Sequence, residues 1–147
     1  MKPYAAAQIS IAEFHALAAE TLPFATTFGF RIEHLEAGRA RGRMVFNQSQ
    51  LRPGGTIAGP AIMALGDYVM YAVVLSLIGR VELTVTTNLT CNFLRRPRPA
   101  DLMAEGRIIK LGKRLAYGEV LMTTEGDDDP VAHITATYSI PPKPENG

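Results

Sequence analysis

Asp67 is the residue in this sequence that is best placed to do chemistry, because it is the one charged side chain in a long apolar stretch, residues 56–78. A carboxylate in such surroundings can accept a proton or attack an electrophile. Ionisable groups that are held against the cost of desolvation gather at functional sites. The structural alternative is a buried carboxyl that only accepts hydrogen bonds from threonine or backbone donors. The sequence favours the functional interpretation of Asp67.

Gly59 and Pro60 mark the expected start of the helix that carries Asp67. Proline fits the first helical turn, where its missing N–H and fixed φ cost nothing. Glycine leaves the backbone amide open to approach, and the free N–H groups and positive dipole end of a helix favour an anionic oxygen there. We expect this helix to cover residues 59–77, with Gly79 as its stop.

The predicted helix is apolar on every side, so it must be buried either by protein or by lipid. A carboxylate in the middle of a membrane is costly, and the ends of the helix lack the aromatic belt and basic loop of a membrane span. We therefore expect a central helix that other elements surround, and no membrane partner.

Composition limits the class of protein. A chain of 147 residues predicts one domain, 1–147. The formal net charge of +1 provides no strong field to recruit nucleic acid. Cys91 is the only cysteine, which excludes an internal disulfide and a cysteine-based zinc site. The first ten residues lack the apolar core of a signal peptide, so we expect a cytoplasmic protein.

The elements around the central helix are predicted from periodicity. Ser10 and Glu13 form a capping box at the start of a short amphipathic helix, residues 10–22, which Pro23 ends. From Phe30 to Phe46 the apolar period changes to two, which indicates a hairpin. A Pro- and Gly-rich loop then leads to the central helix.

Four strand-like runs follow the central helix. They cover residues 81–94, 102–111, 115–124 and 131–140, and residues 141–147 form an expected frayed tail. Short turns join these runs, and few helical signals lie among them. The pattern predicts an α+β protein in which an antiparallel sheet curls around one helix.

Four segments of the chain resemble a known family. They are the loop LRPGGTIAGP, the helix AIMALGDYVMYA, the strand TVTTNLTCNFLRRP and the run DLMAEGRIIKLGKRLAYGEV. Over nearly its whole length, the chain resembles the hotdog-fold acyl-CoA thioesterases of the phenylacetate-degradation (PaaI-like) type. The resemblance implies a hotdog fold, with an antiparallel sheet wrapped around a long central helix, and hydrolysis of acyl-CoA thioesters to free acid and CoA.

The motif of that family is matched only in part. The family loop reads Asn-x-x-Gly-x-x-His-Gly-Gly, with an acidic residue two turns later, and its first glycine, its next glycine and its acid fall on Gly55, Gly59 and Asp67. The departures are Arg52 in place of Asn, Ala58 in place of His and Pro60 in place of the second Gly. The acid and the glycine amide are thus present, whereas the assisting side chains are replaced.

The resemblance implies catalytic roles for three residues: Asp67 as base or nucleophile, the Gly59 N–H as oxyanion donor, and Thr86 as a hydroxyl that orients water. Asp67 lies roughly 12 Å beyond Gly59 along the helix axis, at 1.5 Å per residue. That distance is too long for one thioester, and the family solves this by supplying the two groups from different subunits. We expect a homodimer or a tetramer of two dimers, with no metal or cofactor beyond the CoA of the substrate.

The candidate substrate-binding residues lie in the loop and on the strand after the central helix. They are Arg52, Gly55, Ala58, Pro60, Thr87, Arg95 and Arg96. Arg52 holds a substrate carboxylate, pairs with the partner subunit's Asp67, or is a solvated loop cation. Arg95 and Arg96, like Arg98, Lys113 and Arg114, stand at strand ends where the family binds nucleotide phosphates, and ordinary surface charge is the alternative.

Two other functions stay open. The first is a non-hydrolytic acyl-CoA-binding or regulatory protein that kept the fold while it lost the Asn and His. The second is a hotdog hydratase, which is disfavoured because that chemistry needs a histidine near the acid. The three scattered histidines do not suggest a metal site, and Cys91 is more typical of a core residue than of a nucleophile.

Overall fold

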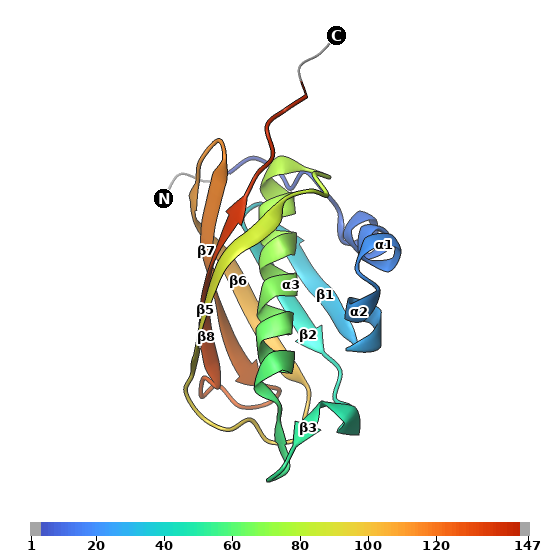
Figure 1. Cartoon of the computed structure of the whole chain (residues 1–147), viewed down its shortest axis with the longest axis vertical. Helices are drawn as coiled ribbons and strands as arrows, with labels where there is room; N and C mark the ends of the chain where they lie inside the picture. Colours follow the sequence, from blue (N-terminus) through green and yellow to red (C-terminus); the bar gives the residue numbers. More distant parts are fainter. Residues whose placement is uncertain (1–3, 145–147) are drawn as a thin grey trace.

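The computed structural model describes residues 4–144, in which one six-stranded antiparallel sheet curls around the long helix α3 (Figure 1). The elements in chain order are α1 (Ile11–Thr21), α2 (Pro23–Thr27), β1 (Phe30–Glu36), β2 (Arg39–Met44), the 3-10 turn η1 (Gln48–Gln50), β3 (Leu51–Arg52), β4 (Thr56–Ile57), α3 (Gly59–Ile78), β5 (Val85–Phe93), β6 (Leu102–Leu111), β7 (Leu115–Thr124) and β8 (Ala132–Ser139). The strand order is β1-β2-β6-β7-β8-β5, and β3 and β4 form a separate two-stranded sheet. The predicted architecture, a sheet around one apolar helix, is confirmed.

Most element boundaries agree with the periodicity, and the differences have local causes. The capping box of Ser10 and Glu13 starts α1 as expected, but Pro23 also begins the short helix α2, which the sequence analysis missed. The strand after α3 begins at Val85 rather than at residue 81, because Thr84 donates its N–H to the carbonyl of Val81 in a turn. Of the predicted tail, residues 145–147 lie outside the described residues.

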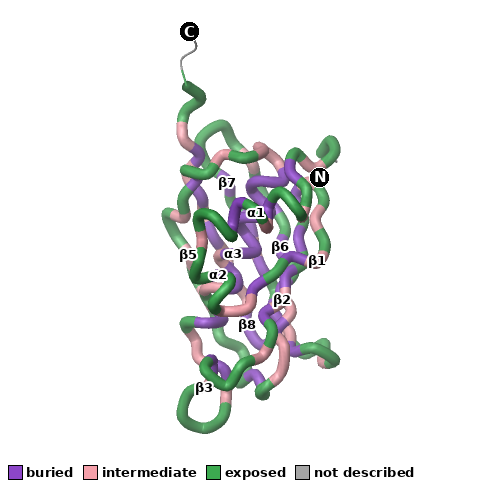
Figure 2. The backbone as a smooth tube through the Cα atoms, turned by 90° about the vertical axis from the view of Figure 1, so that its right-hand side faces the viewer, coloured by how far each residue is buried: buried purple, intermediate pink, exposed green. Residues whose placement is uncertain are grey.

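α3 is the core of the protein rather than a membrane span. It is long and apolar enough to cross a membrane, but 72% of its most apolar 18-residue window is buried inside the fold. Figure 2 shows this buried helix behind the outer turns of α1 and α2, which are largely exposed. Phe14 holds α1 against α3, since its ring centroid lies 5.3 Å from that of Tyr68 and 5.9 Å from that of Tyr71.

Small residues on the sheet allow α3 to lie close to it. A Cβ on Gly106 of β6 would lie 2.9 Å from a Val69 methyl group, and one on Gly118 of β7 would lie 2.5 Å from the Met70 methyl group. Real Cβ atoms do not make such contacts, so the Val69 and Met70 side chains of α3 would have to move away from the sheet. The closeness of helix and sheet therefore depends on glycine at these strand positions.

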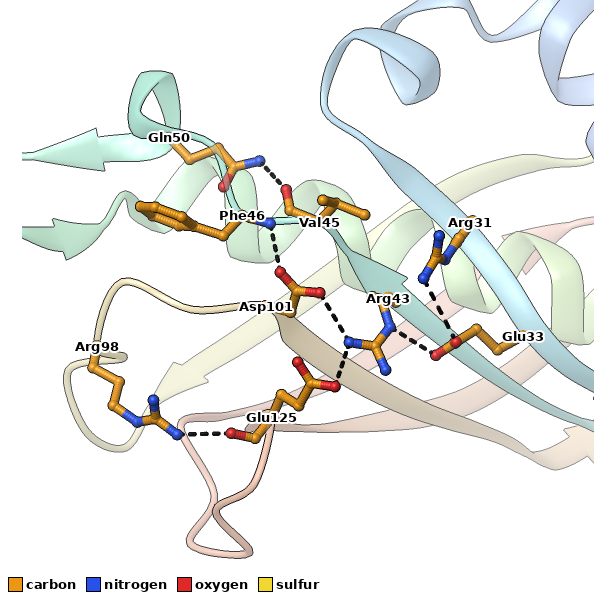
Figure 3. Close-up of polar contacts among 9 residues, drawn as sticks. All are labelled: Arg31, Glu33, Arg43, Val45, Phe46, Gln50, Arg98, Asp101 and Glu125. Carbon is orange, nitrogen blue, oxygen red and sulfur yellow. Dashed lines mark hydrogen bonds and ion pairs between the residues drawn. The ribbon is translucent and has the colours of Figure 1, made fainter.

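A cluster of charged residues links strands and loops at the end of the sheet near the start of α3 (Figure 3). The Arg43 side chain on β2 is only 14% exposed and pairs with Glu33 at 3.0 Å, Asp101 at 2.9 Å and Glu125 at 2.8 Å. Asp101 also accepts a 2.8 Å hydrogen bond from the Phe46 N–H. Burial raises the pKa of Asp101, but the Phe46 N–H and the Arg43 guanidinium outweigh it and hold that pKa below its ordinary value.

The same region holds both loops that flank the start of α3. The side-chain amide of Gln50 donates to the backbone oxygens of Val45 at 2.9 Å and Phe28 at 3.2 Å, which anchors the loop before α3. The Thr56 hydroxyl donates to the Pro97 oxygen at 2.9 Å, and Arg98 donates to the Glu125 oxygen at 2.7 Å, which anchors the loop after β5. These contacts make the start of α3 a fixed platform between two loops.

We expect Asp101→Ala to lower the free energy of unfolding by about 2 kcal/mol at neutral pH, because Arg43 and the Phe46 N–H lose a charged acceptor. The lowered pKa of Asp101 means that this stabilisation is fully present above the unfolded-state pKa of about 3.9 and is lost as the pH falls through the folded-state pKa. Urea unfolding should therefore show a smaller difference between variant and native protein in acid.

Glu125→Ala is the matched control, because Glu125 pairs with the same guanidinium but its side chain is 53% exposed. Its loss should cost less than about 1 kcal/mol. Equal losses for the two variants would contradict the role that we assign to Asp101.

Candidate active site

The carboxylate of Asp67 is half-buried, and one of its oxygens forms hydrogen bonds with two hydroxyl groups. The Thr86 hydroxyl on β5 donates to Oδ1 at 2.6 Å, and the Tyr138 hydroxyl on β8 lies 2.5 Å from the same Oδ1. Thr86 and Tyr138 are direct partners in the β5–β8 pairing, so the two side chains leave the sheet together toward α3. The register of these strands therefore places both donors at the carboxylate.

Tyr138 is the site residue that the sequence analysis missed. Its ring is 2% exposed, and its hydroxyl also lies 2.7 Å from the backbone oxygen of Asp67. Burial, together with the negative charge of Asp67, raises the pKa of Tyr138 well above its ordinary value, so the phenol keeps its proton. The alternation of β8 carried a usable signal: Tyr138 follows Ile134 and Ala136 on the inner face, and a buried tyrosine needs a hydrogen-bond partner.

The Gly59 amide lies at the start of α3, about two helical turns before Asp67. Gly59 is the first residue of the helix, and within residues 4–144 no acceptor contacts its N–H. A Cβ at this position would lie 3.3 Å from the Phe93 ring, so the absence of a side chain lets that ring approach the helix start. The amide thus meets the requirement for an oxyanion donor, which is an N–H without an internal acceptor.

A cavity of about 430 Å³ adjoins the Gly59 amide. Its lining residues are Arg52, Pro53, Thr56, Ile57, Gly59, Ile62, Phe93, Leu94, Arg95, Arg96 and Pro97. The lining combines apolar side chains with three arginines, and it includes no acidic residue among those the structure describes. An acyl thioester that carries an anionic portion would be complementary to such a lining.

The three arginines are not equivalent. Arg95 donates to Asp127 at 3.1 Å and to Asp129 at 2.8 Å, so its charge is already compensated. Arg52 and Arg96 are exposed and form no ion pair or side-chain hydrogen bond with any residue between 4 and 144. Arg95 and Arg96 are equivalent in the sequence, which does not reveal the Asp127 and Asp129 contacts because these depend on how two loops meet.

Asp67 does not line this cavity. Met63 and Ala64 precede it by one helical turn on the same side of α3 and are incompletely buried. On β5, Leu89 and Cys91 face the core and are also incompletely buried, and burial raises the pKa of the Cys91 thiol. One chain therefore presents the amide and the carboxylate at separate places, joined by a partly open apolar face.

The remaining predicted site residues have clear positions. The hydroxyl of Thr87 donates to the Thr137 oxygen at 3.2 Å, so Thr86 and not Thr87 contacts Asp67. Gly55 lies at the tip between β3 and β4 with a φ of 71° and open space around it. Ala58 and Pro60 flank Gly59 at the start of α3, and no side chain of residues 4–144 caps the helix there.

Other polar residues considered in the sequence have structural contacts. His15 accepts a 2.9 Å hydrogen bond from the Ile32 N–H, and burial together with the Arg31 charge lowers its pKa. His133 lies 3.0 Å from Glu119, whose pKa it lowers, together with Arg107, against an opposing effect of burial. The β6–β7 turn, which carries Lys113 and Arg114, lies at the opposite end of the sheet from the cavity (Figure 1).

The chain is similar to known sequences and to solved structures. The chain is 31% identical over 113 residues to a candidate esterase from Saccharolobus solfataricus, covering 76% of this chain and 73% of that protein. A solved structure of a candidate thioesterase from Silicibacter sp. TM1040 has 40% sequence identity and a TM-score of 0.85, covering 92% of this chain and 94% of that one. Both similarities extend well beyond the α3 region.

A more distant structure has the same fold. A mutant of the phenylacetic acid degradation protein PaaI from Thermus thermophilus has 24% identity and a TM-score of 0.73, covering 81% of this chain and 99% of that one. At this identity the match supports the fold alone. The family model of the thioesterase superfamily matches residues 54–131, which include α3 with Gly59 and Asp67, and β5 with Thr86. The chain has the hotdog fold and belongs to the thioesterase superfamily.

Proposed function

We propose that this protein hydrolyses acyl-CoA thioesters to a free acid and CoA, with Asp67 as the general base or nucleophile. Membership of the superfamily supports hydrolysis of thioesters in general. The single observation that carries the mechanism is the half-buried Asp67 carboxylate, which Thr86 and Tyr138 hold on an otherwise apolar helix. A structural design would avoid a charge at this position, because its desolvation is costly.

As general base, Asp67 would take a proton from water as the water oxygen attacks the thioester carbonyl carbon. The carbonyl oxygen would become an oxyanion and accept a hydrogen bond from the Gly59 N–H, where the dipole of α3 favours negative charge. Collapse of this intermediate would break the C–S bond, and the leaving thiolate would take up the proton that Asp67 received from the water. The products are a carboxylic acid and the thiol of CoA.

The site would be completed by two chains. Asp67 does not line the cavity at Gly59, and β5 is an edge strand of the sheet. The edge is apolar as well as open, because Val85, Phe93 and Leu94 are each more than half exposed. Unpaired strand edges of this kind associate with other strands. We propose a homodimer formed along β5, with a tetramer of two dimers as a further assembly.

The arginines would recognise the CoA part of the substrate. Arg96 and Arg52 bring positive charges to the cavity that are uncompensated within residues 4–144, and phosphate groups are strong partners for guanidinium. No metal or additional cofactor is proposed, because the carboxylate and the amide suffice for hydrolysis. A cytoplasmic location and a PaaI-like subtype belong to the same proposal.

A non-hydrolytic acyl-CoA-binding protein is the second candidate. The observation that favours it is Ala58, which precedes the Gly59 amide and has only a methyl group to offer to a substrate carbonyl. Such a protein would retain the cavity and the arginines and bind the thioester without cleaving it. Turnover measured beside the binding of a non-hydrolysable analogue separates the two candidates.

Asp67→Asn should lower turnover on the order of a hundredfold or more while acyl-CoA binding persists. The amide oxygen can still accept hydrogen bonds from Thr86 and Tyr138, so the melting temperature should stay the same or rise. Thiol release and a thermal melt measure both quantities on one preparation. Asp128→Asn, which removes one exposed charge in the β7–β8 turn, is the control. A lower melting temperature with unchanged turnover would show a purely structural Asp67.

Arg96→Ala should raise the Michaelis constant for acyl-CoA severalfold at low salt. It should leave the value for an acyl-pantetheine, which lacks the nucleotide phosphates, nearly unchanged. Lys113→Ala removes a positive charge at the far end of the sheet and serves as the control. An equal effect of Arg96→Ala on both substrates would argue against a phosphate contact.

The protein should sediment as a dimer or larger assembly at micromolar concentration, because the proposed site needs the amide of one chain and the carboxylate of another. Activity per chain should fall when dilution dissociates the assembly. A fully active monomer in sedimentation at the assay concentration would overturn the shared site.

A further inference from the structure

We propose that Tyr138 is a positioning residue that holds Oδ1 of Asp67 and leaves Oδ2 as the oxygen that reacts. This inference rests on the proposed thioester hydrolysis and adds to it which atom of the carboxylate takes part. Tyr138 lies outside the four sequence segments that resemble the family.

The two carboxylate oxygens of Asp67 have different surroundings. Oδ1 accepts the Thr86 hydroxyl at 2.6 Å and lies 2.5 Å from the Tyr138 hydroxyl. Oδ2 forms no hydrogen bond with any residue from 4 to 144. Hydrogen-bond donors stabilise negative charge on the oxygen they contact. Oδ2, which has no such donor, is therefore the more basic and more nucleophilic oxygen of the two. The asymmetry marks Oδ2 as the reactive atom.

Tyr138 is better suited to fix the carboxylate than Thr86. Its strand, β8, lies inside the sheet between β7 and β5, whereas Thr86 belongs to the edge strand β5. Its ring is buried and stacks on Tyr71, with centroids 6.3 Å apart and an interplanar angle of 18°. A buried ring that packs against Tyr71 has little freedom to turn, so its hydroxyl defines where Oδ1 must lie.

The second contact of Tyr138 extends this constraint to the helix backbone. The hydroxyl lies 2.7 Å from the backbone oxygen of Asp67 as well as 2.5 Å from Oδ1. The main chain and the side chain of Asp67 are therefore both held in place by one fixed atom, the Tyr138 hydroxyl oxygen on β8. The phenol keeps its proton at working pH because burial and the Asp67 charge raise its pKa. Tyr138 thus remains a hydrogen-bond donor.

The test replaces Tyr138 by Phe, which keeps the ring and removes the hydroxyl. We expect kcat to fall on the order of tenfold while KM for acyl-CoA changes by less than about twofold, because positioning of the carboxylate is lost but the cavity is not. The acid limb of the kcat/KM profile should move to higher pH, since the charged carboxylate loses one donor. A residue that only stabilised the fold would move neither quantity.

Tyr71→Phe is the matched control, because phenylalanine keeps the ring that stacks on Tyr138 and removes only the hydroxyl. Tyr71 is also a buried tyrosine, with its pKa raised mainly by burial, but its hydroxyl donates to the backbone oxygen of Glu82 at 3.0 Å and not to Asp67. Its loss should lower the melting temperature without changing kcat per folded molecule or the acid limb. If Tyr138→Phe behaves like Tyr71→Phe, the positioning role is wrong.

Thr86→Val and Thr86→Ser keep the proposal testable if Tyr138→Phe folds poorly. Valine removes the second donor to Oδ1 and should lower kcat and shift the acid limb in the same direction, and serine should restore both. Unchanged kinetics in Thr86→Val would overturn the assignment of Oδ1 as the held oxygen.

The outcome for Asp67→Asn separates this inference from the proposed function. If Asp67→Asn abolishes turnover while Tyr138→Phe and Thr86→Val leave kcat and the acid limb unchanged, only the positioning inference fails. If Asp67→Asn retains full turnover, the proposed mechanism fails and the positioning inference fails with it.

Discussion

The structure depends on accommodating one carboxylate, that of Asp67, inside an apolar helix–sheet interface. Such a charge must be hydrogen-bonded or its burial destabilises the fold. Here two hydroxyl groups from adjacent strands meet Oδ1 of Asp67, and the carboxylate stays half-exposed on its other side. The hydrogen bonds therefore offset the cost of burying this carboxylate only in part. A fully satisfied carboxylate would be stable but inert, and an uncompensated one would take up a proton or disrupt the core.

This local balance requires a rigid frame around α3. The glycines of β6 and β7 bring the helix against the sheet, and α1 covers it from the other side through Phe14. At the start of α3, the cluster around Arg43 and the side chain of Gln50 fix the loops on either side of the helix. The amide of Gly59 and the carboxylate of Asp67 thus have fixed positions on one straight element, and their separation is set by the helix itself.

Much of the fold could be predicted from the sequence because its strongest signals are periodic and local. The bounds of β6 and β7, the capping box of α1 and the long apolar α3 follow from spacing alone. The site was predictable only where it lies on a motif, as for Asp67, Gly59 and Thr86. Tyr138 is 71 residues from Asp67, and the pairing of Arg95 with two aspartates depends on the approach of two loops. Such contacts are created by strand register and loop closure, which single-chain periodicity does not encode.

The glycine-lined contact between α3 and the sheet has a consequence for how this scaffold can change its specificity. Because Gly106 and Gly118 leave no room for even a Cβ beside the Val69 and Met70 side chains of α3, the sheet side of the helix offers no space for a ligand. If the protein hydrolyses acyl thioesters as proposed, a change in acyl-chain preference would have to take place on the partly open side, where Met63 and Ala64 are incompletely buried. A flexible thioether next to a small alanine is a surface that adapts readily to ligands of different shape. The fold thus separates a closed side of α3, which packs against β6 and β7, from a partly open side that carries both Asp67 and the adaptable residues Met63 and Ala64.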